Sequence, residues 1–441
     1  MFNERKHKMI SKNKSGKLSQ TTSWVVSLLV LSAFGFIGCE TLDFSNPNSP
    51  ELASASTQQL VTGAESNMRF GLNRYLQVTE IIGRNTYFIE PSDPRFTTEL
   101  LSGPIDAGGF LNNTPWTRRY QVVFNCNELL ARAEGAGVEG FAKTIRAYQL
   151  LLMLNYLDTE GIRTNFDGDV TKPFATKEEG FNFIENDLNE AHTALGSAGG
   201  SFSFALSDGF AGFDTPAGFA RFNRAIAARV AVYRGKFNDA LTALGQSFLD
   251  PAGDLNLGVY HVYSSSAGDV LNPIFEIPTA AVINYYAHPS IETDAQTNAG
   301  GTVDGRFSSK VVKRAPFIND DLTSDLGVTV ANSSTAPWPI IRNEELILLR
   351  AEANIGLMQY SVAEADLNIV RTAAGLDAYT GTDATNALDR LLYEKRYSLF
   401  GEGHRWIDMR RYGRLGDLPL DRPGDVIITN MVRPEDEVSE N

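Results

Sequence analysis

The sequence is poor in the residues that bind metals and form cross-links. Its 441 residues include two cysteines, Cys39 and Cys126, and five histidines, none of which are paired at i, i+4. Zinc sites are built from clusters of Cys and His, and the sequence has no such cluster. The glycines form neither a P-loop nor the glycine fingerprint of dinucleotide-binding folds. We therefore expect no metal and no cofactor.

Positive charge is also scarce. Lys and Arg number 39 against 53 Asp and Glu, which gives a formal net charge of −14. Residues 1–38 alone carry a net charge of +5, so the rest of the chain carries −19. An excess of negative charge repels nucleic acids, polyanionic glycans and anionic lipid headgroups. Nucleic acid is thus disfavoured as a partner, and neutral or cationic ligands fit better.

The apolar run Trp24–Ile37 is too short for a membrane-spanning helix, which needs about 20 apolar residues. It follows a basic and polar stretch and ends at Gly38-Cys39. This order is typical of a bacterial lipoprotein signal peptide, here residues 1–38, whose removal leaves a lipidated Cys39 as the new N-terminus. An ordinary secretory signal with an incidental cysteine is the alternative. Residues 39–56, with a tract rich in Asn, Pro and Ser from Ser45 to Ser56, are then a tether. With Cys39 lipidated, no disulfide can form within the chain.

The periodicity of apolar residues predicts a mainly α-helical single domain over residues 57–441. Two distant stretches, Ala228–Ala240 and Ala351–Ala363, share one layout. In each, a helix with small residues leads into a short turn, followed by an aromatic residue and an alanine three positions later. This layout is typical of tetratricopeptide-like helical hairpins, with chance similarity between amphipathic hairpins as the alternative. The two stretches are separated by a long irregular insertion, about residues 251–339.

Three passages resemble a known family, namely Phe222–Phe237, Pro339–Ala353 and Leu392–Gly413. The last is the most specific, since it contains Gly-Glu-Gly-His-Arg-Trp at residues 401–406. Together with Cys39 and the Leu-Asp and Asn-Pro-Asn tract behind it, they resemble the SusD/RagB family of outer-membrane nutrient-binding lipoproteins. The chain departs from the family pattern in its closing segment, residues 433–437, and in a shorter insertion.

The resemblance implies both a fold and a function. The fold is a SusD-like scaffold of tetratricopeptide-like helical hairpins with long loop insertions. The protein is expected to be anchored in the cell outer membrane by lipid such as palmitate on Cys39, facing the exterior. There it would act as a hinged lid on a SusC-like TonB-dependent receptor and deliver a nutrient to it without catalysing a reaction. Family members mostly bind oligosaccharides, and a peptide is the alternative ligand.

The residue clusters that suggest catalysis have simpler interpretations. His404, with its neighbours Arg405, Trp406 and Asp408, is expected to lock a helix junction through packing and hydrogen bonds. Glu344 and Glu345 point about 100° apart on a helix, so they cannot flank one glycosidic bond. We expect them to begin a helix capped at Asn343.

Ligand contacts are expected in the loops, where aromatic faces can stack on sugar rings and polar groups can bind hydroxyls. Each candidate could instead be a core or loop-anchoring residue, and Trp116, expected to open a helix after the irregular stretch Pro91–Pro115, favours the core. The candidates are Tyr285, Tyr286, His288, Asp294 and Arg306 in the insertion, and Tyr87, Trp116 and Arg118 around the earlier stretch.

Two other functions stay open at this stage. Helical hairpin arrays commonly bind protein segments, so the chain could be an interaction lipoprotein that binds no glycan. A surface glycosidase is the second, because carboxylates from distant loops, such as Asp93, Asp294 and Asp304, could still be brought together by folding.

Overall fold

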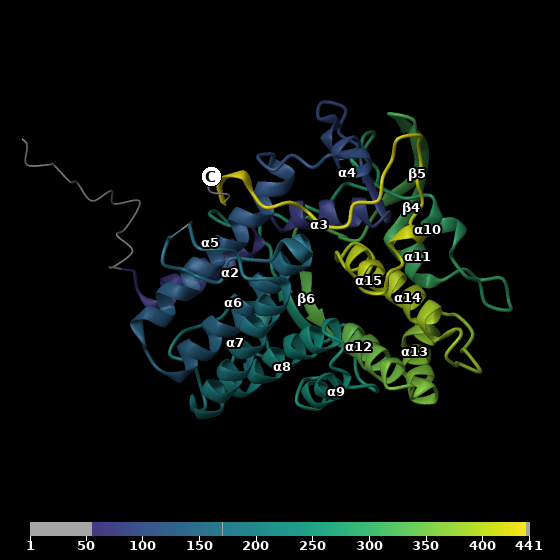
Figure 1. The fold of residues 1–441 in the computed structure, drawn as a ribbon. Coiled ribbons are helices and arrows are strands. Elements are labelled where there is room, and N and C mark those ends of the chain that lie inside the picture. Colours follow the sequence, from purple (N-terminus) through teal and green to yellow (C-terminus); the bar gives the residue numbers. More distant parts are fainter. Residues whose placement is uncertain (1–54, 170, 438–441) are drawn as a thin grey trace, which may run out of the picture. The chain divides into compact units, whose positions relative to one another are not determined.

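The computed structural model describes residues 55–169 and 171–437, and the predicted signal peptide and Cys39 lie outside them. Residues 56–441 form one compact unit. Helices dominate the described residues (Figure 1), which confirms the mainly α-helical fold class.

The longer helices are α2 (Thr57–Arg69), α3 (Leu72–Ile82), α5 (Phe110–Arg132), α6 (Ala136–Leu157), α7 (Lys177–Ser197), α8 (Pro216–Tyr233), α9 (Phe237–Gly245), α12 (Asn343–Gly356), α13 (Tyr360–Ala373), α14 (Ala387–Ser398) and α15 (Arg405–Arg411). The short helices are α4 (Glu99–Ser102), α10 (Ser290–Thr293) and α11 (Gly305–Lys310). Within residues 55–437, no helix combines the length and the apolarity that a membrane crossing requires.

Local sequence explains where the helices begin and which face they bury. Helix α7 starts at a capping box, in which Thr176 Oγ1 accepts from the Glu179 amide and Glu179 Oε2 accepts from the Thr176 amide. These bonds satisfy backbone donors that have no partner in the first turn of a helix. One stripe of α7, including Phe181, Ile184 and Leu188, is buried.

Successive helices pack against one another as an array. Helix α5 packs on α6, α6 on α7, α7 on α8, and α8 on α9 (Figure 1). The two hairpins expected from the sequence are α8–α9 and α12–α13, and they contact each other through α9 and α12. A Cβ atom on Gly356 would lie 2.1 Å from the ring of Phe237, so glycine permits this close approach. The array therefore continues across the insertion that separates the hairpins in sequence.

The insertion is more ordered than the sequence suggested. It contributes all but one of the strands in the described residues, and they form two small antiparallel sheets. The first has the order β1-β3-β5-β4, and the second pairs β2 with β6. The strands are β1 (Thr86–Phe88), β2 (Gly258–His261), β3 (Tyr285–Ala287), β4 (Val311–Asn319), β5 (Leu322–Val328) and β6 (Trp338–Arg342). The three-residue strands β1 and β3 are almost wholly buried, so they lack the alternation that marks a half-buried strand.

The start of α5 differs from the expectation for Trp116. The helix begins at Phe110, so Trp116 lies inside it and the irregular stretch ends before Pro115. Proline has no amide hydrogen, and Pro115 therefore leaves the Leu111 carbonyl without its usual helical donor. The hydroxyl of Tyr156 on α6 donates to that carbonyl at 2.6 Å. A tertiary contact thus replaces the missing hydrogen bond, which is why the sequence alone placed the helix start too late.

The last part of the chain, residues 418–437, ties distant elements together. It runs past α3 toward α5 (Figure 1, yellow). Arg84, which follows α3, donates to the carbonyls of Pro419 at 3.1 Å and Val426 at 3.0 Å. The Met431 amide donates to the Tyr156 carbonyl at 2.9 Å. The closing segment is thus held by the Arg84 side chain and by the backbone carbonyl of Tyr156 on α6.

The contact between Gly356 and Phe237 gives a test of the array. Replacing Gly356 with Ala should lower the free energy of unfolding by about 1–2 kcal/mol, because the added methyl group overlaps the ring. In the Phe237→Ala variant the same change should lower the free energy of unfolding only slightly, because the ring is absent. Urea unfolding of the unchanged protein, the two single variants and the double variant then yields the coupling energy between the two residues. Gly245→Ala is the matched control, since Gly245 also ends a helix but has open space around it. Independent effects of the two substitutions would contradict this packing.

Candidate functional site

The C-terminal signature folds into a buried junction between α3, α14 and α15. The Trp406 side chain is 0% exposed, and its Nε1 donates to the Ile428 carbonyl at 2.8 Å. Arg405 Nε donates to the Gly83 carbonyl at 3.0 Å, and the Gly403 amide to Glu80 Oε1 at 2.6 Å. Gly403 has a φ of +82°, a conformation that favours glycine. The expectation that this cluster locks a helix junction is confirmed.

A buried ion cluster joins this junction to the helical array. Lys395 on α14 contacts Glu352 on α12 and Asp408 on α15, each at 2.8 Å. Arg411 contacts the same two carboxylates at 2.6 Å. Burial alone would raise the pKa of Glu352, but Arg411 and Lys395 hold that pKa below its ordinary value. The two cations thus favour the ionised form of both carboxylates.

The adjacent carboxylates of α12 face different partners, as their spacing predicted. Glu345 forms a bidentate pair with Arg229 at 2.6 and 2.7 Å, and Glu344 contacts Arg342 at 2.7 Å. The expected cap at Asn343 is wrong. Helix α12 begins at Asn343 itself, and the Asn343 side chain instead donates to the carbonyls of Asp250 and Asp254 in the preceding loop.

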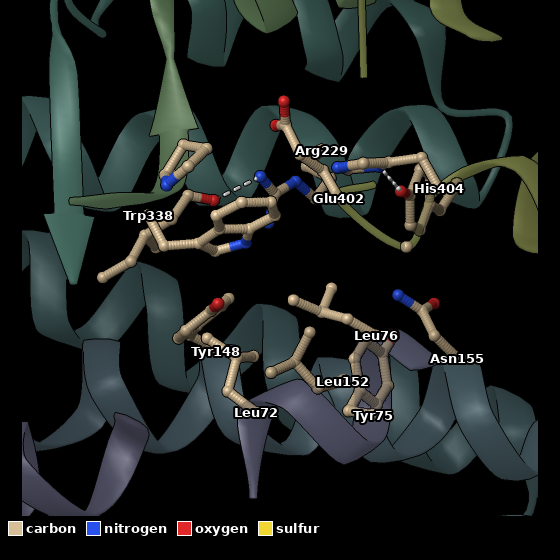
Figure 2. Close-up of a pocket in the computed structure, with 14 residues that line it drawn as sticks. Leu72, Tyr75, Leu76, Tyr148, Leu152, Asn155, Arg229, Trp338, Glu402 and His404 are labelled. Carbon is tan, nitrogen blue, oxygen red and sulfur yellow. Dashed lines mark hydrogen bonds between the residues drawn. The ribbon is translucent and has the colours of Figure 1, made fainter. Parts of the chain in front are cut away.

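Next to this junction lies an enclosed pocket. Figure 2 shows Trp338, Arg229, Glu402 and His404 on one side and Tyr75, Leu152 and other residues of α3 and α6 on the opposite side. Arg229 donates to the Ile340 carbonyl at 2.8 Å, and the Tyr233 hydroxyl lies 3.3 Å from His404 Nδ1. The cavity volume is about 30 Å³, which is room for a single water molecule. This pocket is therefore too small for a sugar ring.

Four of the predicted ligand residues come together at the first sheet. Tyr87 on β1 pairs in register with Tyr286 on β3, and the Tyr87 ring lies 5.2 Å from the His288 ring. His288 Nε2 lies 2.9 Å from Asp421 Oδ1. All four residues, including Tyr285, are buried. The structure thus gives them a packing role, and their assignment as ligand contacts stays a prediction.

The other predicted residues of the insertion form ion pairs with α14. Arg306 is buried and contacts Asp304 and Glu394, each at 2.6 Å. Asp294 is exposed and accepts from Arg396 at 2.6 Å. Both residues therefore anchor the insertion to the C-terminal helices, although Asp294 keeps an open side toward solvent.

The two predicted residues on α5 lie apart from the sheet. Trp116 is buried, its ring stacks on Phe174 at a centroid distance of 5.4 Å, and its Nε1 donates to Glu437 at 3.2 Å. Arg118 is exposed, and its guanidinium lies 5.9 Å from the centre of the Phe70 ring. Within the described residues, Arg118 and Asp294 are the predicted ligand contacts that solvent reaches freely.

A surface groove between α5 and residues 163–169 fits sugar binding better than the predicted residues do. Its volume is about 220 Å³. Phe124 lies in it with 50% of its surface exposed, beside Phe166. Asn127, Asn165 and Asp169 supply amide and carboxylate groups along the same groove. Within residues 55–437, Phe70 and Phe124 are the only exposed aromatic side chains.

Sequence reasoning missed this groove because Phe124 is in a regular helix and not in a loop. Two signals were available. Phe124 follows Tyr120 by four residues on a face of α5 that also carries Asn127, so that face is not purely apolar. Phe166 stands in the polar run Asn-Phe-Asp-Gly-Asp, where an aromatic residue has few apolar neighbours in sequence.

The C-terminal third decides the relationship to known proteins. Residues 286–438 match the family model described as the SusD family. This part of the chain is similar to the SusD family. The match contains the passage Leu392–Gly413, from which the sequence resemblance drew its most specific residues, and so confirms that resemblance. No curated protein sequence matches the chain.

Solved structures share the fold of this chain across most of its length. A SusD superfamily protein from Bacteroides vulgatus has a TM-score of 0.66 at 14% identity, with 87% of this chain and 97% of that chain covered. A laminarin-binding SusD-like protein has a TM-score of 0.60 at 17% identity, with 87% and 96% covered. The surface glycan-binding protein A from Bacteroides uniformis has a TM-score of 0.58 at 16% identity, with 81% and 88% covered.

The ion cluster at the junction predicts a large effect on stability. Lys395→Met should lower the free energy of unfolding by about 3–5 kcal/mol, because it leaves Glu352 and Asp408 buried with less positive charge. Lys313→Met is the matched control, since the Lys313 side chain is 53% exposed and its ion pairs with Glu292 and Asp325 should contribute at most about 1 kcal/mol. Urea unfolding at neutral pH measures both. Equal stabilities of the two variants would contradict a structural role for the cluster.

Proposed function

We propose that this protein is a non-catalytic lipoprotein that captures an oligosaccharide and delivers it to a SusC-like TonB-dependent receptor. In this proposal Cys39 carries the lipid and anchors the protein in the outer membrane, facing the exterior. Two similar structures support the ligand class, since one is described as laminarin binding and the other as a surface glycan-binding protein. The charge of the chain agrees with a neutral ligand.

The observation that carries the ligand assignment is the groove at Phe124. Sugar rings have apolar faces that stack on aromatic rings, and hydroxyl groups that need donors and acceptors around them. Phe124 and Phe166 offer the rings. Asn127 accepts from Arg146 through its oxygen at 2.7 Å, which leaves its NH₂ group available to a hydroxyl. We therefore assign the groove as a glycan contact surface.

The absence of catalysis in this proposal agrees with the use of the buried carboxylates. Glu345 is paired with Arg229, Glu352 with Lys395 and Arg411, and Glu394 with Arg306 and Arg371. A general acid for glycoside cleavage needs a carboxyl group that keeps its proton near neutral pH and that reaches the scissile oxygen. These carboxylates are instead held in ion pairs inside the protein, so they serve the fold.

The groove assignment predicts the effect of removing one ring. Phe124→Ala should weaken oligosaccharide binding about tenfold, equivalent to about 1.4 kcal/mol, and should leave the folded structure intact because the ring is half exposed. Isothermal titration against a panel of neutral oligosaccharides, laminarin fragments first, measures this. Phe70→Ala is the matched control, since Phe70 is the other exposed aromatic residue and lies beside Arg118.

Three outcomes of this titration would count against parts of the proposal. A loss with Phe70→Ala alone would move the glycan site to the Arg118 surface. No binding of any oligosaccharide at millimolar concentration, together with binding of peptides, would replace the ligand class. Steady release of reducing ends from a bound sugar would make the protein an enzyme.

The anchor and the partner are tested on cells that express the natural gene. Mass spectrometry of the mature N-terminus should find a diacylated or triacylated Cys39, and Cys39→Ala should release the protein from the outer-membrane fraction. Purification through a tag on this chain should recover a TonB-dependent receptor in stoichiometric amount. An unmodified Cys39 in the mature protein would overturn the lipid anchor.

A further inference from the structure

A second pocket lies away from the groove at Phe124. It is enclosed by α2, the residues before α8 and the end of β2, and its volume is about 390 Å³. It shares no lining residue with the groove. A volume of this size accommodates a small ligand or one end of a larger one.

Hydrogen-bond acceptors dominate the polar lining of this pocket. Glu65 on α2 accepts from the Ser207 amide at 3.1 Å and, within the described residues, forms no ion pair. Burial raises the pKa of Glu65 to about 7, although the bonds from Ser207 and the charge of Arg69 oppose this shift. The protein thus keeps a carboxyl group inside a pocket without supplying a cation of its own to pair with it.

The one cation of the pocket is already engaged. Arg69 contacts Asp269 Oδ1 at 2.5 Å and donates to the Val262 carbonyl at 2.7 Å. Asp269 and Val262 both line the pocket. The Arg69–Asp269 pair is therefore close to neutral as a unit, and the remaining carboxylate, Glu65, sets the charge of the site.

An orphaned imidazole completes the pocket. His261 on β2 is 3% exposed, and its Nε2 has no hydrogen-bond partner. Burial and the nearby cations Arg119 and Arg69 lower the pKa of His261 to about 3, so the ring is neutral at physiological pH. A neutral imidazole nitrogen can accept a hydrogen bond when the other nitrogen carries the proton. A buried polar atom without a partner is costly and is usually satisfied by a ligand or water.

We propose that this pocket binds the primary ammonium group of a small ligand, with Glu65 as its counter-ion and His261 as a further acceptor. An ammonium group has three donors and no acceptor, which matches a lining rich in acceptors. The strongly negative charge of the chain favours a cation at this place. An amino sugar and the amino terminus of a peptide carry the same group, so both are possible sources.

The first experiment uses n-butylamine as a minimal probe, with n-butanol as its neutral counterpart. Titration calorimetry with the full-length protein should show binding of the amine and none of the alcohol. Glucosamine against N-acetylglucosamine and trialanine against N-acetyl-trialanine then identify the source of the ammonium group. Binding of the acetylated or alcohol probes as well as the amines would overturn the proposal. The absence of amine binding at a probe concentration of about 10 mM would also overturn it, because this concentration is ten times a weak specific Kd of about 1 mM.

Substitution of Glu65 separates ligand binding from folding. Glu65→Gln keeps the size and the acceptor for Ser207 but removes the charge, and it should weaken butylamine binding at least about tenfold. Glu190→Gln is the matched control, because Glu190 is an exposed carboxylate outside the pocket whose side chain is 61% exposed. Thermal unfolding checks that both variants fold. Unchanged butylamine binding in the folded Glu65→Gln variant would overturn the proposal.

The pH dependence of butylamine binding distinguishes a role of Glu65 in ligand binding from a purely structural role. The other charged or titratable groups that line the pocket are Arg69 on the same helix, Asp269 from the opposite loop and His261 on β2. Ionisation of Glu65 with a pKa of about 7 should therefore tighten butylamine binding up to about tenfold from pH 6 to pH 8, because only the ionised fraction is competent. The amine itself stays protonated over this range. Glu65→Gln should abolish this pH dependence, and a pH dependence that persists in the variant would contradict the role of Glu65.

The Phe124 groove and the Glu65 pocket share no lining residue. Oligosaccharide binding can therefore be present or absent independently of the result with butylamine.

Discussion

The buried cluster of Glu352, Lys395, Asp408 and Arg411 is the contact on which the arrangement of the C-terminal half depends. It joins α12, α14 and α15, which are separated in sequence by loops and glycine-rich turns. Ionised side chains inside a protein must pair with an opposite charge or become neutral. The two cations and the two carboxylates of this cluster can pair only when α12, α14 and α15 lie in this one arrangement. The cluster thus fixes the position of α15 against the helical array, and with it the Trp406 side chain and the segment that follows.

The closing segment, residues 418–437, connects α15 to the N-terminal helices. From α15 it passes Trp406, which bonds to Ile428, and then receives hydrogen bonds from Arg84 beside α3. The same region contains the first sheet, where Tyr87 from the N-terminal part pairs with Tyr286 from the insertion. Long-range contacts of this kind let a long insertion pack as a defined layer although its own strands are short.

The distribution of polar groups separates two kinds of site. Next to the junction, Arg229 pairs with Glu345 and Arg342 with Glu402, and the enclosed cavity has room for a single water molecule. The Phe124 groove and the Glu65 pocket are different, because the Phe124 ring is half exposed and Glu65, although it accepts from the Ser207 amide, forms no ion pair within residues 55–437. An exposed aromatic ring and a carboxyl group without an ion pair contribute little to the stability of a protein, and this agrees with a role in ligand binding at both places.

The sequence by itself determined the helical class, the two hairpins, the family resemblance and the structural role of residues 404–408, because each depends on local spacing or on a contiguous motif. Tertiary structure alone decided which aromatic residues are buried. Tyr285 and Tyr286 stand in the insertion that the sequence marks as irregular, yet strand pairing encloses them, whereas Phe124 stands in a helix and is half exposed. It also decided that α5 continues through Pro115, since a hydroxyl from α6 supplies the missing donor. Burial is a property of what packs against a residue, and that partner is usually distant in the chain.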